Sequence, residues 1–232
     1  MLVKDRMTRE VATVQAETPI YEALTQMEQR HIRRLPVMRR GRIAGIVTYT
    51  DLMRVYPSPA STLTAWEIPH LVMHAPVKEA MTPDPITIHP NAPVEEAARL
   101  MRRHKIGGLP VVEDRKLVGI ITESDIFEAM VDLMGVDRGG LRVTVELARG
   151  AASLCAVTKA LEESGVHLLS VVSYREGDRE RAVLRLSATG PIDVLHRMAA
   201  HGAQVVHLQL RPEDENGRAG SPCTAPVSAM AQ

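Results

Sequence analysis

The chain has 232 residues, of which 45% are hydrophobic and 24% are charged, the balance of an ordinary globular protein. Its 28 basic residues are matched by 28 acidic ones and aromatic residues make up 3%, so we expect no nucleic-acid partner and no attraction to an anionic membrane. The apolar runs are strand-sized, the N-terminus lacks a secretory pattern, and Cys155 and Cys223 show no metal-type spacing. We therefore expect a cytoplasmic protein without a metal site.

An internal repeat organises the first half of the chain. Residues 3–52 align without a gap with residues 77–126, and 17 of these 50 pairs are identical. A repeat of this size is one supersecondary unit that cannot bury a full core alone. The two units are therefore expected to pack together.

Each repeat is predicted to have the same order of elements, beginning with a helix. In the first repeat, Thr18 and Pro19 are typical of an N-cap and a first helical position, and apolar residues follow at helical spacing. Strands are predicted over Leu35–Met38 and Ile43–Val47 with a polar turn between them, and a second helix is predicted to begin near Thr50. The second repeat is predicted to follow the same order.

The remainder of the chain is predicted to contain a linker, a second domain and a tail. Residues 57–76 contain Pro57-Ser58-Pro59, and residues 65–74 are predicted to form a linking helix. The second domain is expected to have the order βαββαβ, a ferredoxin-like α/β sandwich. Its predicted strands are 141–147, 166–174, 182–188 and 205–210, and its predicted helices are 154–165 and 191–201. We therefore divide the chain into 1–56, 57–76, 77–135, 139–210 and a Pro- and Gly-rich tail, 211–232, predicted to be disordered.

The paired motifs resemble those of the cystathionine-β-synthase (CBS) domain family. The resemblance rests on the segments Met7-Thr8, Leu35-Pro36-Val37 and Gly45–Asp51, each of which recurs in register 74 residues later. It implies a tandem CBS motif pair, or Bateman module, over the first half. The segment 139–210 resembles the ACT domain, a small regulatory module, and the domain order is similar to that of acetoin-utilisation B-type proteins. The implied fold class is α/β.

A physical argument links the end of each second strand to nucleotide binding. A helix N-terminus has unpaired N–H groups that suit a phosphate, Thr48 and Thr50 add hydroxyl donors, and Asp51 can accept from ribose hydroxyls. In the CBS family, this set of one motif is paired with early residues of the other motif. The resemblance thus implies one site from Thr48, Thr50, Asp51, Ile86, Ile106 and Gly107, and another from Thr122, Ser124, Asp125, Ala12, Ile32 and Arg33. The implied ligand is an adenine nucleotide such as AMP or ATP, or S-adenosylmethionine.

Each of these features also has a simpler interpretation. The Thr and Asp residues are typical helix caps. His70 and His74 have helical metal-ligand spacing, but without a third ligand nearby they are expected to be solvated. A basic cluster, Arg30, Arg33, Arg34, Arg39, Arg40 and Arg42, is either a solvated surface or contributes one anion contact; its best-placed member is Arg33, whose counterpart is Gly107.

In the ACT-like segment, the family's usual effector-binding residues are replaced by Ala151-Ala152 and His167, which favours dimerisation over amino-acid binding. No catalytic motif is evident. We predict a non-enzymatic, homodimeric regulatory protein that binds an adenine nucleotide and relays its level to a protein partner, with a role in acetoin or acetate metabolism implied by the resemblance alone. The alternatives are an interaction protein with non-binding CBS motifs and an amino-acid-binding ACT domain, or an enzyme subunit with hidden chemistry.

Overall fold

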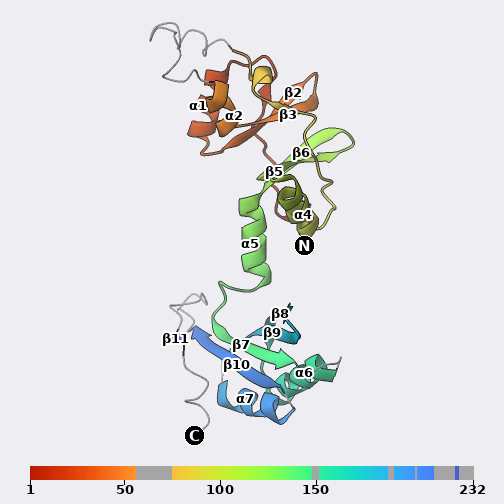
Figure 1. Ribbon diagram of the computed structural model, residues 1–232, viewed down its shortest axis with the longest axis vertical. Coiled ribbons are helices and arrows are strands. Elements are labelled where there is room, and N and C mark those ends of the chain that lie inside the picture. Colours follow the sequence, from red (N-terminus) through yellow and green to blue (C-terminus); the bar gives the residue numbers. More distant parts are fainter. Residues whose placement is uncertain (56–74, 148–151, 188–190, 202, 212–222, 225–232) are drawn as a thin grey trace. The chain divides into compact units, whose positions relative to one another are not determined.

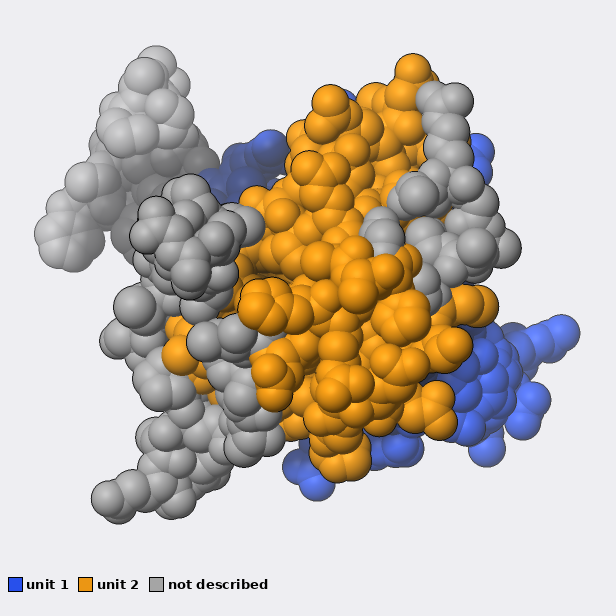
Figure 2. Space-filling view, turned by 90° about the horizontal axis from the view of Figure 1, so that it is seen from below, with its two compact units in different colours: residues 1–129 blue, residues 130–232 orange. Residues whose placement is uncertain are grey.

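The computed structural model describes residues 1–55, 75–147, 152–187, 191–201, 203–211 and 223–224 (Figure 1). The chain divides into two compact units, Met1–Ala129 and Met130–Gln232, coloured separately in Figure 2. Almost all of the predicted linker, including the helix predicted for 65–74, lies outside the described residues.

The first unit contains both repeats. Its elements are η1 (Val3–Asp5), β1 (Val14–Gln15), α1 (Ile20–Gln29), β2 (Arg34–Arg39), β3 (Arg42–Thr48), α2 (Tyr49–Val55), η2 (Val77–Glu79), β4 (Thr82–Pro83), α4 (Val94–His104), β5 (Gly108–Glu113), β6 (Lys116–Thr122) and α5 (Glu123–Leu133), whose last turn passes into the second unit. The predicted strand pairs are confirmed as the antiparallel pairs β2–β3 and β5–β6. The tandem repeat thus forms a mixed α/β fold.

The start of α1 differs by one residue from the prediction. Pro19, rather than Thr18, is the N-cap: it has extended φ and ψ angles, and its carbonyl oxygen accepts a hydrogen bond from Ala23 N. The Thr18 hydroxyl instead accepts a hydrogen bond from Gln15 N at 3.1 Å. Thr18 therefore stabilises the turn before the helix and leaves the cap position to Pro19.

The two repeats exchange their first residues. Val3 and Met7 pack in the hydrophobic core of the second repeat, whereas Val77 and Met81 pack with the core of the first. The strands follow the same exchange, because β4 of the second repeat pairs with β3 of the first, and Thr8 bridges to Ile120. The sequence repeat is therefore not the packing unit.

Two equivalent glycines permit this close approach. A Cβ at Gly45 would lie 2.6 Å from the sulfur of Met81 and 2.9 Å from the carbonyl oxygen of Thr82. A Cβ at Gly119 would lie 2.5 Å from the sulfur of Met7. Both positions thus require glycine for steric reasons, since any side chain would displace the exchanged segment.

The second unit has the predicted βαββαβ order. Its elements are β7 (Gly140–Leu147), α6 (Ala152–Ser164), β8 (Leu168–Glu176), β9 (Arg179–Leu186), α7 (Pro191–Ala200), β10 (Gln204–Arg211) and β11 (Cys223–Thr224). They form an antiparallel sheet of order β11-β10-β7-β9-β8, and one face of β7 and β9 packs with α6 and α7 in a separate hydrophobic core. The predicted C-cap is confirmed at Gly165, which has a φ of +64°.

The predicted disorder of the tail does not extend to all of residues 211–232. Arg211 is the last residue of β10, and Cys223–Thr224 pairs with β10 as β11. A two-residue strand among Pro, Gly and Ser carries no periodicity that a sequence pattern can detect, because its order comes from its neighbour.

Candidate functional site

The predicted Thr–Asp sets form helix caps in both repeats. Asp125 accepts hydrogen bonds from the backbone N and hydroxyl of Thr122 at 2.7 and 2.8 Å, and Asp51 accepts from the same groups of Thr48 at 3.0 and 2.7 Å. In both aspartates these bonds end on Oδ2, and no described group donates to Oδ1. Capping therefore occupies one carboxylate oxygen and leaves the other available to a ligand.

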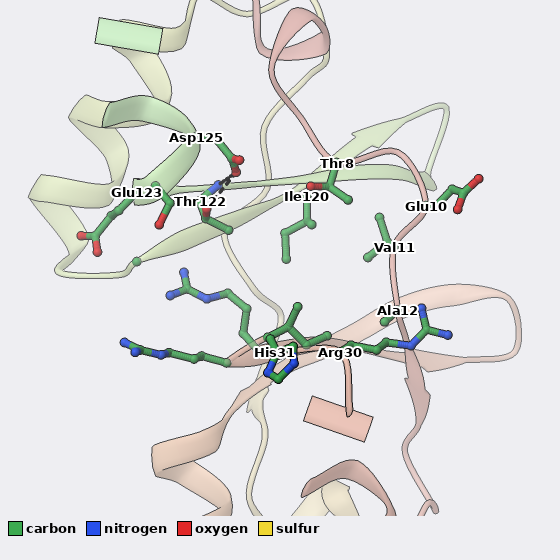
Figure 3. Close-up of a pocket in the computed structure, with 15 residues that line it drawn as sticks. Thr8, Glu10, Val11, Ala12, Arg30, His31, Ile120, Thr122, Glu123 and Asp125 are labelled. Carbon is green, nitrogen blue, oxygen red and sulfur yellow. Dashed lines mark hydrogen bonds between the residues drawn. The ribbon is translucent and has the colours of Figure 1, made fainter. Parts of the chain in front are cut away.

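A cavity of about 640 Å³ lies at the N-terminus of α5 (Figure 3). Its volume is in the range of pockets that bind small molecules. One wall comes from β6 and α5, and the other from the chain before β1 and the end of α1. Its lining residues are Thr8, Glu10, Val11, Ala12, Arg30, His31, Ile32, Arg33, Arg34, Gly107, Ile120, Thr122, Glu123, Ser124 and Asp125.

The structure brings one of the two predicted site sets together. All of its members, Thr122, Ser124, Asp125, Ala12, Ile32 and Arg33, line this cavity. The apolar lining residues Val11, Ala12, Ile32 and Ile120 give it a hydrophobic part beside the polar helix end.

Five residues of the other predicted set lie outside this cavity, and a second site built from them stays a prediction. Thr48, Thr50, Asp51, Ile86 and Ile106 do not line the cavity, and both isoleucines pack against the core of the second repeat. Gly107, predicted to lie with Asp51, lines the cavity of Asp125 instead. Its carbonyl oxygen accepts a hydrogen bond from Glu123 N at 3.2 Å, which holds it beside the start of α5.

Several lining residues were not predicted from the sequence, above all Arg34 and Glu123. The guanidinium of Arg34 lies against the backbone of Gly107, where a Cβ would be 2.8 Å from Nη2 and 3.1 Å from Oε2 of Glu123. Burial lowers the pKa of Arg34, an effect opposed by the charge of Glu123. The alignment of the two repeats could have singled out Arg34, because its counterpart in the second repeat is a glycine, Gly108.

No metal-ligating group is found among the described residues, where no three His, Cys, Asp or Glu side chains cluster. His70 and His74 lie outside the described residues. Arg39, Arg40 and Arg42 line a separate surface depression with Ala44. None of the described helices is both long and apolar enough to cross a lipid bilayer.

Comparison with known proteins matches the first half of the chain. The model of the CBS domain matches residues 3–58 and 77–132. A CBS domain-containing protein of Dictyostelium discoideum is 34% identical over 137 residues, covering 58% of this chain and 94% of that protein.

Two solved structures were also matched. A protein assigned to acetoin utilization (AcuB) from Vibrio cholerae is 34% identical with a TM-score of 0.49, covering 59% of this chain and 94% of that one. CBSX2 in complex with AMP is 27% identical with a TM-score of 0.49, covering 57% of this chain and 97% of that one.

Proposed function

This chain belongs to the CBS domain family, and on that premise we propose that it is a regulatory protein that binds an adenine nucleotide in the cavity at the start of α5. The observation that carries the proposal is the convergence of three kinds of group on one cavity. These are a helix N-terminus with hydroxyl donors, an aspartate with an available oxygen, and an apolar part lined by Ile32 and Ile120.

Each part of a nucleotide has a matching group in this cavity. The N-terminus of α5 and the hydroxyls of Thr122 and Ser124 suit a phosphate, because the helix end has unpaired N–H groups. Oδ1 of Asp125 suits a ribose hydroxyl as an acceptor. The apolar residues, including Val11, suit the flat base. This arrangement suits AMP, ADP and ATP, and the adenosine part of S-adenosylmethionine.

We propose that α5 relays ligand binding along the chain to a protein partner. Its first turn lines the cavity, and its last turn and the segment that follows belong to the second unit. Met134 O accepts hydrogen bonds from Ser170 Oγ at 2.8 Å and from Nε of the buried Arg185 at 3.2 Å. A ligand that binds one arrangement of the two repeats better shifts the equilibrium toward it, and α5 is the element that would report the shift.

We also propose that the second unit is an ACT-like module that supports a homodimer. Strand β8 lies at the edge of its sheet, and Val171, Val172 and Tyr174 are each about two-fifths exposed. A long apolar edge strand is a template for pairing with another chain. The opposite edge, β10, is already paired with β11. A role in acetoin metabolism is part of the proposal through the sequence resemblance.

The binding proposal is tested by calorimetry and thermal shift with AMP, ADP, ATP and S-adenosylmethionine. At a hundredfold excess over Kd, the bound nucleotide should raise the free energy of unfolding by about 2.7 kcal/mol. Asp125→Ala should weaken binding at least tenfold, the effect of losing about 1.4 kcal/mol.

The matched control is Asp51→Ala, which removes the equivalent cap outside the cavity. Both variants should lose about 1 kcal/mol of stability through the cap, but only Asp125→Ala should lose affinity. The proposal fails if no adenosine compound binds at millimolar concentration, or if Asp125→Ala binds as the unmodified chain does.

A further inference from the structure

Three arginines line the cavity, and one of them is half-buried. The side chains of Arg30, Arg33 and Arg34 make no hydrogen bond or ion pair in the part of the chain that the structure describes. Arg30 and Arg33 are exposed to solvent, whereas Arg34 is half-buried beside Glu123. A guanidinium has five N–H donors, and leaving these without acceptors is unfavourable where burial excludes water. The guanidinium of Arg34 therefore suits an acceptor-rich group in the cavity.

Arg185 is a contrasting case among the described residues. It is buried, and it donates to two backbone carbonyl oxygens, Met134 O at 3.2 Å and Arg138 O at 3.4 Å. The half-buried guanidinium of Arg34 makes no such hydrogen bond among the described residues.

We propose that the cavity binds one nucleoside polyphosphate per chain, with Arg34 as the residue that selects it over a monophosphate. This proposal rests on the proposed adenine-nucleotide function. Figure 3 shows Thr122 and Asp125 on one wall and Arg30 and His31 on the other. A single phosphate is satisfied at the N-terminus of α5. Further phosphates are required to pair with the guanidiniums of the opposite wall, which bind phosphate through paired N–H groups.

The carboxylates of the cavity strengthen the preference for a polyphosphate. The charges of Glu123 and Asp125 both act on Arg34, and Glu123 flanks Gly107 with it. A ligand that replaces these carboxylates as the neighbour of Arg34 must bring a phosphate beyond the one at the N-terminus of α5. A diphosphate or triphosphate does so, whereas S-adenosylmethionine has no phosphate.

The repeat places Arg33 and Arg34 in the cavity of Asp125 and has glycines at the equivalent positions. The counterparts of Arg33 and Arg34 are Gly107 and Gly108, and the guanidinium of Arg34 occupies the space beside both glycines. The Thr48–Asp51 set therefore receives no guanidinium from these positions.

The experiment is calorimetry of the full chain with ATP and with AMP at one ionic strength. We expect about one ATP per chain and at least tenfold tighter binding of ATP than of AMP, because only ATP has further phosphates that can pair with Arg34. Arg34→Gln should weaken ATP at least tenfold and AMP less than about threefold. Arg42→Gln, in the separate depression, should change neither affinity.

A second variant tests the role of Arg34 independently, in case Arg34→Gln misfolds. Gly108→Ala retains the charge but displaces Arg34, so it should weaken ATP more than AMP. Equal affinities for ATP and AMP, two equivalent ATP sites, or an equal loss for both ligands in Arg34→Gln would overturn this inference while leaving the nucleotide function intact. If neither ligand nor any adenosine compound binds, the proposed function itself fails.

Discussion

At the scale of single residues, the two Thr–Asp pairs combine the two roles considered from the sequence. The hydrogen bonds to Oδ2 of Asp51 and Asp125 cap α2 and α5, and Asp125 also lines the cavity at the start of α5. Sequence could predict the cap in both repeats, because the residue types and spacing are the same. It could not predict which residues complete the cavity of Asp125, since these include side chains such as Arg34 that come from the other repeat.

A residue in the left-handed backbone conformation follows the first helix of each repeat. These two residues allow a prediction about stability. His31 and Lys105 are equivalent positions with φ angles of 53° and 54°, a conformation that costs a residue with a Cβ roughly 1–2 kcal/mol. His31→Gly and Lys105→Gly should each raise the free energy of unfolding by about 1 kcal/mol, measured by urea denaturation. A loss of stability in both variants would contradict the backbone geometry.

At the scale of elements, the order of helices and strands is predictable but the exchange between repeats is not. Helical spacing over 20–27 and the alternation over 141–147 lead directly to α1 and β7. A gapless repeat instead suggests that Val3 belongs with the first repeat, whereas it packs in the core of the second. In the sequence, the exchange is reflected in Gly45 and Gly119. Their close contacts with the exchanged segments become visible only in the packed structure.

The exchange predicts reciprocal effects of two equivalent substitutions. Val3 and Val77 are fully buried, each in the core of the repeat to which it does not belong in sequence. Val3→Ala should destabilise the second repeat and Val77→Ala the first, each by about 1–3 kcal/mol for the lost contacts and the cavity left behind. Hydrogen exchange should therefore increase in β5 and β6 for Val3→Ala, and in β2 and β3 for Val77→Ala. The opposite pattern would mean that each segment packs with its own repeat.

At the scale of the whole molecule, separate cores and one continuous helix define the organisation. The core of the second unit consists of residues 141–208, and the cores of the repeats contain none of these residues. The segment after α5 is part of the second unit, where Arg185 and Arg211 donate to carbonyl oxygens of residues 134–138. A protein truncated at the predicted boundary near residue 135 would therefore leave this segment without its hydrogen-bond donors.

The last prediction concerns the edge of the second sheet. If two chains pair through β8, a lysine at Val172 should weaken the homodimer, because a charge on an edge strand opposes strand addition. Light scattering at tens of micromolar should then report a dimer for the unmodified chain and a lower mass for Val172→Lys. The control is Gln204→Lys. Gln204 is exposed on β10 and pairs with Glu146 of the neighbouring strand β7, so this lysine should leave the mass unchanged. A monomeric unmodified chain would contradict the homodimer, and a Val172→Lys chain that remains dimeric would exclude β8 as the strand that joins the two copies.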